Sequence, residues 1–498
     1  MEMQFDRLPV PYLKKLTHGI RTQEETLEVR LPEGMPDIGR VLGAWGQVIV
    51  RGKEWNGSNM TLSCGVMAWA LYTPEDGEDV RSIEAWLPFT MQWDLPETRY
   101  DGKILSYCAL KSIDARSTSA RKLMVRAVLQ ADADAYQVEQ AQLAVPGELP
   151  ADVQLLTAQY PMLLPREAGE KAFALEEQLS ISDMPKPKKL LYYALQPELT
   201  DKKVMAGKVV FRGSAMLHVL YRCEDEQLYS WDYELPFSQY ADLDDEYSQE
   251  AELDVTACVT ALDISLDEAG QLQLKAGLLG QYLLSERTML SVTEDAYSPN
   301  RRLELQFEQL DLPAVLDSLN TSLQPEVCFQ AEAQRVVDAV FLPGCGQLTC
   351  RDSECKAMLS GLFQMLYYDL EGNLRSAAAA CEAYWIIPGD TGNEAVVRIT
   401  AAGKPQASVG GNAVVLRTDM SAEACISAGQ GIRMLTALEL GEAEKPDPNR
   451  PSLILCRKGS RKLWDISKET GSTVEAILQA NNLTEEPEEG QILLIPVK

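Results

Sequence analysis

The sequence predicts a mainly β, multi-domain protein that ends in a small α+β domain. Short apolar or alternating runs, separated by turn residues, follow one another along most of the chain, and helical spacing marks two segments near the C-terminus. One strand–turn–strand pattern also occurs three times, which predicts three related β-rich domains of the sandwich or barrel type. The 498 residues suffice for three or four domains, and the 46% hydrophobic content is typical of a globular chain.

The first β-rich unit begins near Glu25. Residues 66–72 are almost wholly apolar, so we expect a strand that is buried on both faces. Proline and glycine predict turns at residues 32–38 and 73–77. The strands predicted for this unit are residues 26–31, 48–50, 66–72, 83–89, 104–113 and 123–129.

Two short signatures of this unit recur downstream. A Leu-Tyr pair precedes an acidic turn in all three copies, and a Leu-Pro-Phe triplet occurs in the first two. The third copy is weaker, because Trp385, Ile386 and Ile387 stand in place of the triplet. The pair lies at residues 71–72, 220–221 and 366–367, and the triplet at 87–89 and 235–237.

The last 46 residues predict the order strand, helix, helix, strand. Gly471 should end the first helix, Ser472 or Thr473 should cap the second, and residues 492–496 form a strand closed by proline. Leu463, Ile466, Val474 and Ile477 are the predicted core of this βααβ domain.

The same residues resemble a LysM domain, a family that in general binds N-acetylglucosamine polymers. One departure concerns the loop before the first helix, which is one residue longer here and lacks the usual Asp-Thr pair. The segments that carry the resemblance are residues 463–467, 473–477, 481–483 and 490–496.

The upstream signatures resemble SPOCS-type domains, which are named for spore coat and cell-surface proteins. The residues concerned are 28–38, the Leu-Tyr pair with its acidic turn, the triplet, and residues 115–122. Several such domains followed by a LysM domain form the layout of the SipL-like sporulation proteins. The resemblance implies a non-enzymatic assembly protein that docks through its LysM domain on a SpoIVA-like morphogenetic ATPase at the forespore surface and helps encase the forespore in coat.

Proline-containing stretches suggest where the domains meet. Four prolines lie in residues 144–169 and three in residues 441–452, and the second group predicts a semi-stiff spacer that holds the last domain away from the rest. The predicted division is a leader (1–24), a first SPOCS-type domain (25–143), a linker (144–169), a second domain (170–297), a weaker third domain (298–440), a linker (441–452) and the LysM-like domain (453–498).

Charge and hydropathy limit the partners and the location. The net charge of −28 argues against nucleic acid and anionic lipid, which would both repel the chain. We see no apolar run long enough to span a membrane and no signal peptide, so we expect no membrane insertion and a cytoplasmic protein of the mother cell. The acidic excess also has a plainer reading, which is solubility.

Few residues suit catalysis. The chain has two histidines, and we expect His218 to be a hydrogen-bonded strand residue and His18 to lie in the leader. We find no phosphate-binding loop, and the eleven cysteines are expected to be reduced thiols, since the five-residue spacing of Cys345, Cys350 and Cys355 does not suit zinc. We therefore expect no catalytic residues, no cofactor and no metal.

Two oppositely charged loops flank the expected ligand groove of the LysM-like domain. Residues 457–462 hold four cations and residues 484–489 hold four anions, which suits a charged protein surface better than a neutral sugar. Trp464 is the candidate aromatic anchor. The predicted partner-binding residues are Arg457, Lys458, Arg461, Lys462, Trp464, Glu485 and Glu486.

Two alternatives remain open, whereas a hydrolase with a wall-targeting module is disfavoured because we find no catalytic constellation. The loops could simply pair with each other while Trp464 covers the core of its own domain. The chain could instead bind peptidoglycan, as a cell-wall or cortex protein. What the three repeats bind, other coat proteins or each other, is not decided by the sequence.

Overall fold

Antiparallel β-sheets make up almost the whole chain in this computed structural model, and two short helices lie near the C-terminus, which confirms the predicted fold class. The structure describes residues 2–497 except 76, 78, 97–100, 183, 352–353, 389–393 and 444–450. Within the described part, no helix combines the length and the apolar character needed to cross a membrane.

The first stretch, residues 6–145, forms two three-stranded sheets. Strands predicted from the alternating pattern are all present but longer than predicted, because pairing continues beyond the apolar runs. Val66, Leu87 and Leu129 are fully buried between the sheets. The sheet β3–β4–β5 consists of Ile38–Asn56, Asn59–Pro74 and Arg81–Asp94, and the sheet β2–β7–β6 consists of Asp6–Arg30, Lys122–Val145 and Lys103–Ser119.

The second stretch, residues 154–297, repeats this strand order. Its middle three strands form one sheet, and its first strand pairs with its last to make the other. The sheets are β9–β10–β11 (Pro187–Met205, Lys208–Cys223 and Leu228–Asp242) and β8–β13–β12 (Gln154–Leu179, Leu272–Tyr297 and Glu252–Leu266).

The third stretch, residues 301–443, has the same plan with additions. A small extra sheet is inserted, and β1 near the N-terminus joins the edge of β22. The two main sheets are β16–β17–β18 (Ala333–Arg351, Glu354–Asp369 and Leu374–Pro388) and β14–β22–β19 (Arg301–Leu323, Met420–Ala443 and Glu394–Ala402). The additions are β1 (Glu2–Gln4), β15 (Glu326–Gln330), β20 (Gln406–Gly410) and β21 (Ala413–Arg417).

The recurring Leu-Tyr pairs lie in the central strands β4, β10 and β17. In the first two stretches the tyrosine makes the same bond: Tyr72 donates to the Pro36 carbonyl at 3.2 Å, and Tyr221 donates to the Pro185 carbonyl at 3.1 Å. Both side chains are fully buried. The pair therefore ties the central strand to the turn that leads into its sheet.

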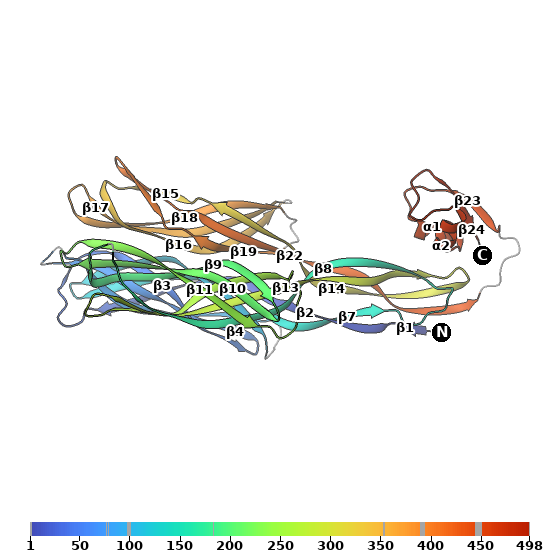
Figure 1. The fold of residues 1–498 in the computed structure, drawn as a ribbon, viewed down its shortest axis with the longest axis horizontal. Coiled ribbons are helices and arrows are strands. Elements are labelled where there is room, and N and C mark those ends of the chain that lie inside the picture. The colour runs from blue at the N-terminus through green and yellow to red at the C-terminus, as the bar shows by residue number, and fades with distance from the viewer. Residues whose placement is uncertain are drawn as a thin grey trace.

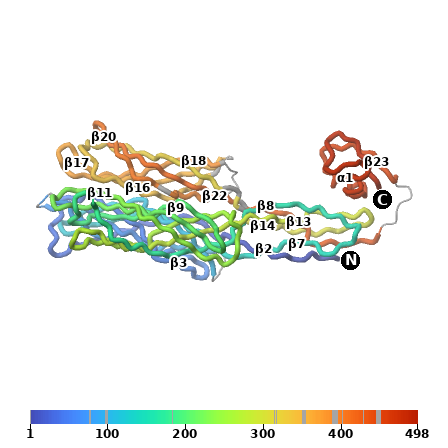
Figure 2. The backbone as a smooth tube through the Cα atoms, in the orientation of Figure 1, coloured from blue at the N-terminus to red at the C-terminus, as the bar shows by residue number. Residues whose placement is uncertain are grey.

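Three long strand pairs extend beyond the sheets as a narrow stalk (Figure 1). They are residues 6–13 with 138–145, 154–164 with 286–297, and 301–313 with 429–443. Leu164, Val292 and Leu438 are fully buried among these pairs. Figure 2 shows the N-terminus and the C-terminal helices near the same end of the stalk.

The predicted leader and first linker consist mostly of strands. Residues 1–24 include β1 and most of β2, and residues 144–169 include the end of β7 and much of β8. Prolines suggested a linker in residues 144–169, but Pro161 and Pro165 lie on β8, as Pro9 and Pro11 lie on β2, and both are edge strands of their sheets. An edge strand accepts proline because its outward N–H needs no partner.

Cysteine oxidation differs from the prediction at one position. Nine cysteines of the described part are free thiols, but Cys355 is disulfide-bonded. The β16–β17 hairpin places the backbone of Cys355 opposite that of Cys350 in the strand register. The five-residue spacing, which does not suit zinc, is thus the spacing of two facing positions in a hairpin.

The C-terminal module, residues 453–497, has the predicted βααβ order. Gly471 ends the first helix in the left-handed conformation at φ 63°, and the Thr473 side chain caps the second by accepting from the Ala476 N–H at 3.1 Å. Its core holds Leu463, Ile466 and Ile477 as predicted, with Val474 packed beside them. The elements are β23 (Leu453–Arg457), α1 (Leu463–Thr470), α2 (Val474–Ala480) and β24 (Ile492–Pro496).

Candidate partner-binding module

Trp464, the predicted anchor, points from α1 to the end of strand β13. Its indole N–H donates to Asp295 Oδ2 at 2.9 Å, and its ring packs edge-on against Tyr297 with centroids 4.7 Å apart. Only 8% of Trp464 is exposed. The side chain therefore covers the stalk and not the core of its own module.

Asp295 is the centre of this contact. Lys468, one turn after Trp464 on α1, donates to both carboxylate oxygens at 2.8 and 2.7 Å. Partial burial of Asp295 opposes its ionisation, but the hydrogen bonds from Lys468 and Trp464 outweigh this and hold its pKa below the usual value. The carboxylate is thus charged at neutral pH and joins the module to the stalk.

Tyr297 completes the contact two residues further on. Its hydroxyl lies 2.8 Å from Ser467 Oγ and 3.0 Å from the Ser472 carbonyl oxygen, both buried at the junction of the two helices. Hydrogen bonds, an ion pair and a ring contact therefore fix the module against the stalk. The expectation of a spacer that holds the module away is wrong for this contact; residues 444–450 of that linker lie outside the described part of the chain.

The two charged loops are partly paired with each other. Lys458 is 3.3 Å from Glu486, and the same carboxylate accepts the Leu463 N–H at 2.6 Å, where α1 begins without a side-chain cap from its own N-cap residue. Arg461 turns instead to Glu469 on α1, at 2.6 Å. Glu486 thereby fixes one loop to the start of the helix.

The predicted partner-binding residues consequently separate into groups. Lys458 and Glu486 belong to an internal ion pair, and Trp464 lies in the stalk contact. Arg457, Lys462 and Glu485 are exposed to solvent. No sequence signal pointed to Asp295 and Tyr297, because their partners on α1 lie about 170 residues further along the chain.

The outer face of the module's sheet was also missed. Leu453, Leu455, Ile492 and Leu494 are 52%, 70%, 66% and 37% exposed. The signal was available: residues 453–456 and 492–495 are apolar on both faces of each strand, whereas the helices can cover one face only.

Outside the module, both histidines lie beside carboxylates at contacts between the stretches. His218 of β10 is 2.6 Å from Asp232 and 3.2 Å from Asp338 of β16, as expected for a hydrogen-bonded strand residue. Burial disfavours the imidazolium, but the two carboxylates outweigh it and raise the pKa of His218 to about 9. This charged cluster ties the second stretch to the third.

His18 belongs to a similar cluster, on β2 and not in a leader. It lies 2.9 Å from Asp134, which is also 3.2 Å from Arg398 of β19. Arg398 pairs in addition with Asp254 of β12. Three stretches therefore share one buried group of charges.

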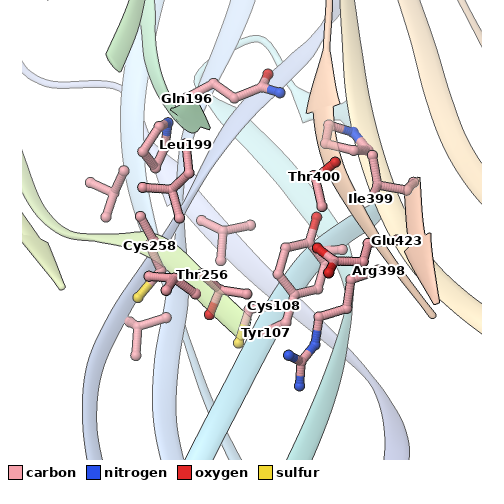
Figure 3. Close-up of a pocket in the computed structure, with 18 of the residues that line it drawn as sticks. Tyr107, Cys108, Gln196, Leu199, Thr256, Cys258, Arg398, Ile399, Thr400 and Glu423 are labelled. Atoms are coloured by element: carbon pink, nitrogen blue, oxygen red, sulfur yellow. The ribbon is translucent and has the colours of Figure 1, made fainter. Parts of the chain in front are cut away.

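A cavity of about 530 Å³ lies beside Arg398, with lining residues from all three stretches (Figure 3). Four of its charged groups form two ion pairs, Arg398 with Asp254 and Glu423 with Lys202 at 3.1 Å. Burial raises the pKa of the Cys258 and Cys425 thiols to about 12, so both stay protonated at neutral pH. The cavity lies where the three stretches pack together, and neither thiol is an activated nucleophile.

Comparison with protein families locates one known domain. Residues 187–267 match the family model described as SipL, SPOCS domain. The match begins at the first residue of β9 and ends one residue after β12. Neither a search of curated proteins nor a search of solved structures found a match. The chain thus contains a SipL SPOCS domain, formed by the sheet β9–β10–β11 and strand β12 of its second stretch.

Proposed function

We propose that this chain is a non-enzymatic assembly protein of sporulating cells that acts in the mother cell at the forespore surface. The observation that carries the proposal is the SipL SPOCS match over residues 187–267. The module is the proposed docking element, and its proposed partner is a SpoIVA-like morphogenetic ATPase. This docking would help to encase the forespore in coat.

The first and third stretches are proposed to be SPOCS domains as well. Their strand order is that of the second stretch, with the first strand paired to the last. The hydrogen bond from Tyr72 to the Pro36 carbonyl in the first stretch corresponds to the one from Tyr221 to the Pro185 carbonyl in the second. Tyr221 lies inside the segment 187–267, and Pro185 lies just before it. Three such domains would offer three related units to coat proteins.

The module is proposed to be a LysM domain that binds protein and not glycan. Its βααβ order and helix caps support the assignment. Lys458 and Glu486 are bound to each other across the loops, which leaves fewer polar groups for sugar hydroxyls. Peptidoglycan binding is the alternative, and the same experiment tests it.

The experiment measures binding of the purified full chain to two probes, the SpoIVA-like ATPase of the same organism and peptidoglycan fragments. We expect binding to the ATPase and none to the fragments. Charge reversal at Arg461 and Lys462 should weaken ATPase binding, whereas reversal at Lys111 and Arg116, two exposed residues of β6, should not. Binding to peptidoglycan alone would refute the docking proposal and favour a wall or cortex protein.

A further inference from the structure

An apolar strip covers the outer face of the module's two-stranded sheet. Leu455 faces Leu494 across the strand register, and Arg457 faces Ile492. Leu455 and Ile492 are exposed over about two thirds of their surface, at 70% and 66%. Large apolar side chains gathered on one exposed face mark an interaction surface more often than scattered ones do.

The opposite face of the same sheet is closed. Leu493 and Ile495 are fully buried, and both helices pack on that side with Ile466 and Ile477. The helices therefore cover one face of the sheet. The module contacts the stalk through Trp464 and Lys468 of α1, and not through the other face of the sheet. The apolar strip stays exposed while the module is docked on the stalk.

Strand β23 is also an open edge of this sheet. Among the residues that the structure describes, it pairs with β24 alone, and the hydrogen bonds from Val497 to Ser452 and from Lys458 to Gln491 set which residues face the partner strand. By alternation, the N–H and C=O groups of Leu453, Leu455 and Arg457 point away from β24. The far edge of β24 differs, because Asn481 bonds both backbone groups of Leu494, at 2.7 and 2.8 Å.

We propose that β23 binds an extended apolar segment of a protein partner by strand addition. Backbone groups of the segment would pair with Leu453, Leu455 and Arg457, its apolar side chains would cover the exposed strip, and a carboxylate would meet Arg457. The inference rests on the proposed docking function and assigns its surface.

Charge favours a different protein over a second copy as the occupant. Residues 453–498 contain six basic and seven acidic residues, a net charge of −1, so residues 1–452 hold −27 of the total −28. Pairing two copies through β23 would bring two strongly acidic bodies together, which costs free energy at low salt. An apolar partner segment with an acidic end would instead contact the near-neutral module and the cationic Arg457, so this repulsion would not arise.

The test uses full-chain variants and the purified SpoIVA-like ATPase as probe. Leu455→Glu and Ile492→Glu alter exposed side chains, so both should fold, and each should lower affinity at least tenfold. Leu370→Glu is the matched control, because Leu370 is 66% exposed and lies between β17 and β18 of the third stretch. This variant should bind the ATPase like the wild type. Sedimentation of each variant checks whether the face joins copies of the chain.

A second pair of variants tests strand addition itself. Leu455→Pro removes the outward N–H, which an edge strand tolerates, while Leu455→Ala keeps it. Strand addition predicts a larger loss of affinity for the proline variant than for the alanine variant.

Three results would overturn the inference. If both glutamate variants bind the ATPase like the wild type, the apolar strip is not the binding surface, although the docking function itself stands. A wild-type dimer that Leu455→Glu converts to monomers would assign the face to a second copy. No binding by the wild type would overturn both the docking proposal and this surface.

Discussion

Replacing Asp295 by alanine should release the module from the stalk. Trp464 would lose the acceptor of its indole N–H while 8% exposed, and a hydrogen bond to a charged group contributes about 1.5–3 kcal/mol. Lys468 is 42% exposed, so its ion pair adds only about 0.5 kcal/mol after solvent screening. The total of about 2–3.5 kcal/mol would lower the ratio of docked to undocked module by about 30- to 300-fold.

Fluorine NMR of the full chain with 5-fluorotryptophan can follow this change. Each of the eight tryptophans contributes one fluorine signal, and the signal lost in Trp464→Phe identifies the residue. In Asp295→Ala that signal should move toward the solvent-exposed position, and adding Tyr297→Ala should complete the shift. Glu294→Ala is the control, because the neighbouring Glu294 contacts Tyr160 and not the module. An unchanged Trp464 signal in the double variant would refute the contact.

The same variant separates two possible partner surfaces. If the partner binds Trp464, the stalk competes with it, and Asp295→Ala should increase the affinity of the full chain for the ATPase. If the partner binds β23 and the apolar strip, release of the module should leave the affinity unchanged. The measured ratio of the two affinities therefore decides between the predicted anchor and the sheet face.

Three further predictions concern stability. The pKa of His218 is raised to about 9 from about 6.5 in the unfolded chain, so its protonation should contribute on the order of 3 kcal/mol below pH 6.5, which is lost as the pH rises through 9. Urea unfolding of wild type and His218→Gln should thus differ more at pH 6 than at pH 10, and a constant difference would contradict the assignment. Tyr221→Phe should lower the free energy of unfolding by about 1 kcal/mol through loss of its bond to Pro185, measured by urea unfolding, and an effect near zero would deny that bond any net contribution. Thr473→Ala should cost the module about 1 kcal/mol by removing the cap of α2, with Thr473→Ser as the variant that restores stability; faster hydrogen exchange in residues 474–480 is the readout.

Local patterns predicted much of this fold. Alternation located the strands of the first stretch, the recurring Leu-Tyr pair marked the central strand of each stretch, and Gly471 with Thr473 fixed the helix ends of the module. These features are local because they depend on backbone conformation or on which face of a strand is buried.

Long-range features escaped prediction for a physical reason. Proline at Pro161 suggested a linker, but the sequence does not tell that β8 is an edge strand, since its partner β13 lies more than 100 residues away. Asp295 and Trp464 are likewise 169 residues apart, and neither position has a pattern that indicates the other. Distant pairs of this kind depend on the assembled stalk.

The strand order explains how the stalk could link the units to the module. In every stretch the first strand pairs with the last, so a sheet closes only when its whole stretch is present. Each stretch can therefore fold as a unit, while the stalk core, which includes Leu164, Val292 and Leu438, forms only when all three pairs have met. Asp295 and Tyr297 lie at the end of β13 in that stalk, so the docking contact forms on an assembled stalk. Both contact residues belong to the second stretch, so misfolding of that stretch alone should already release the module.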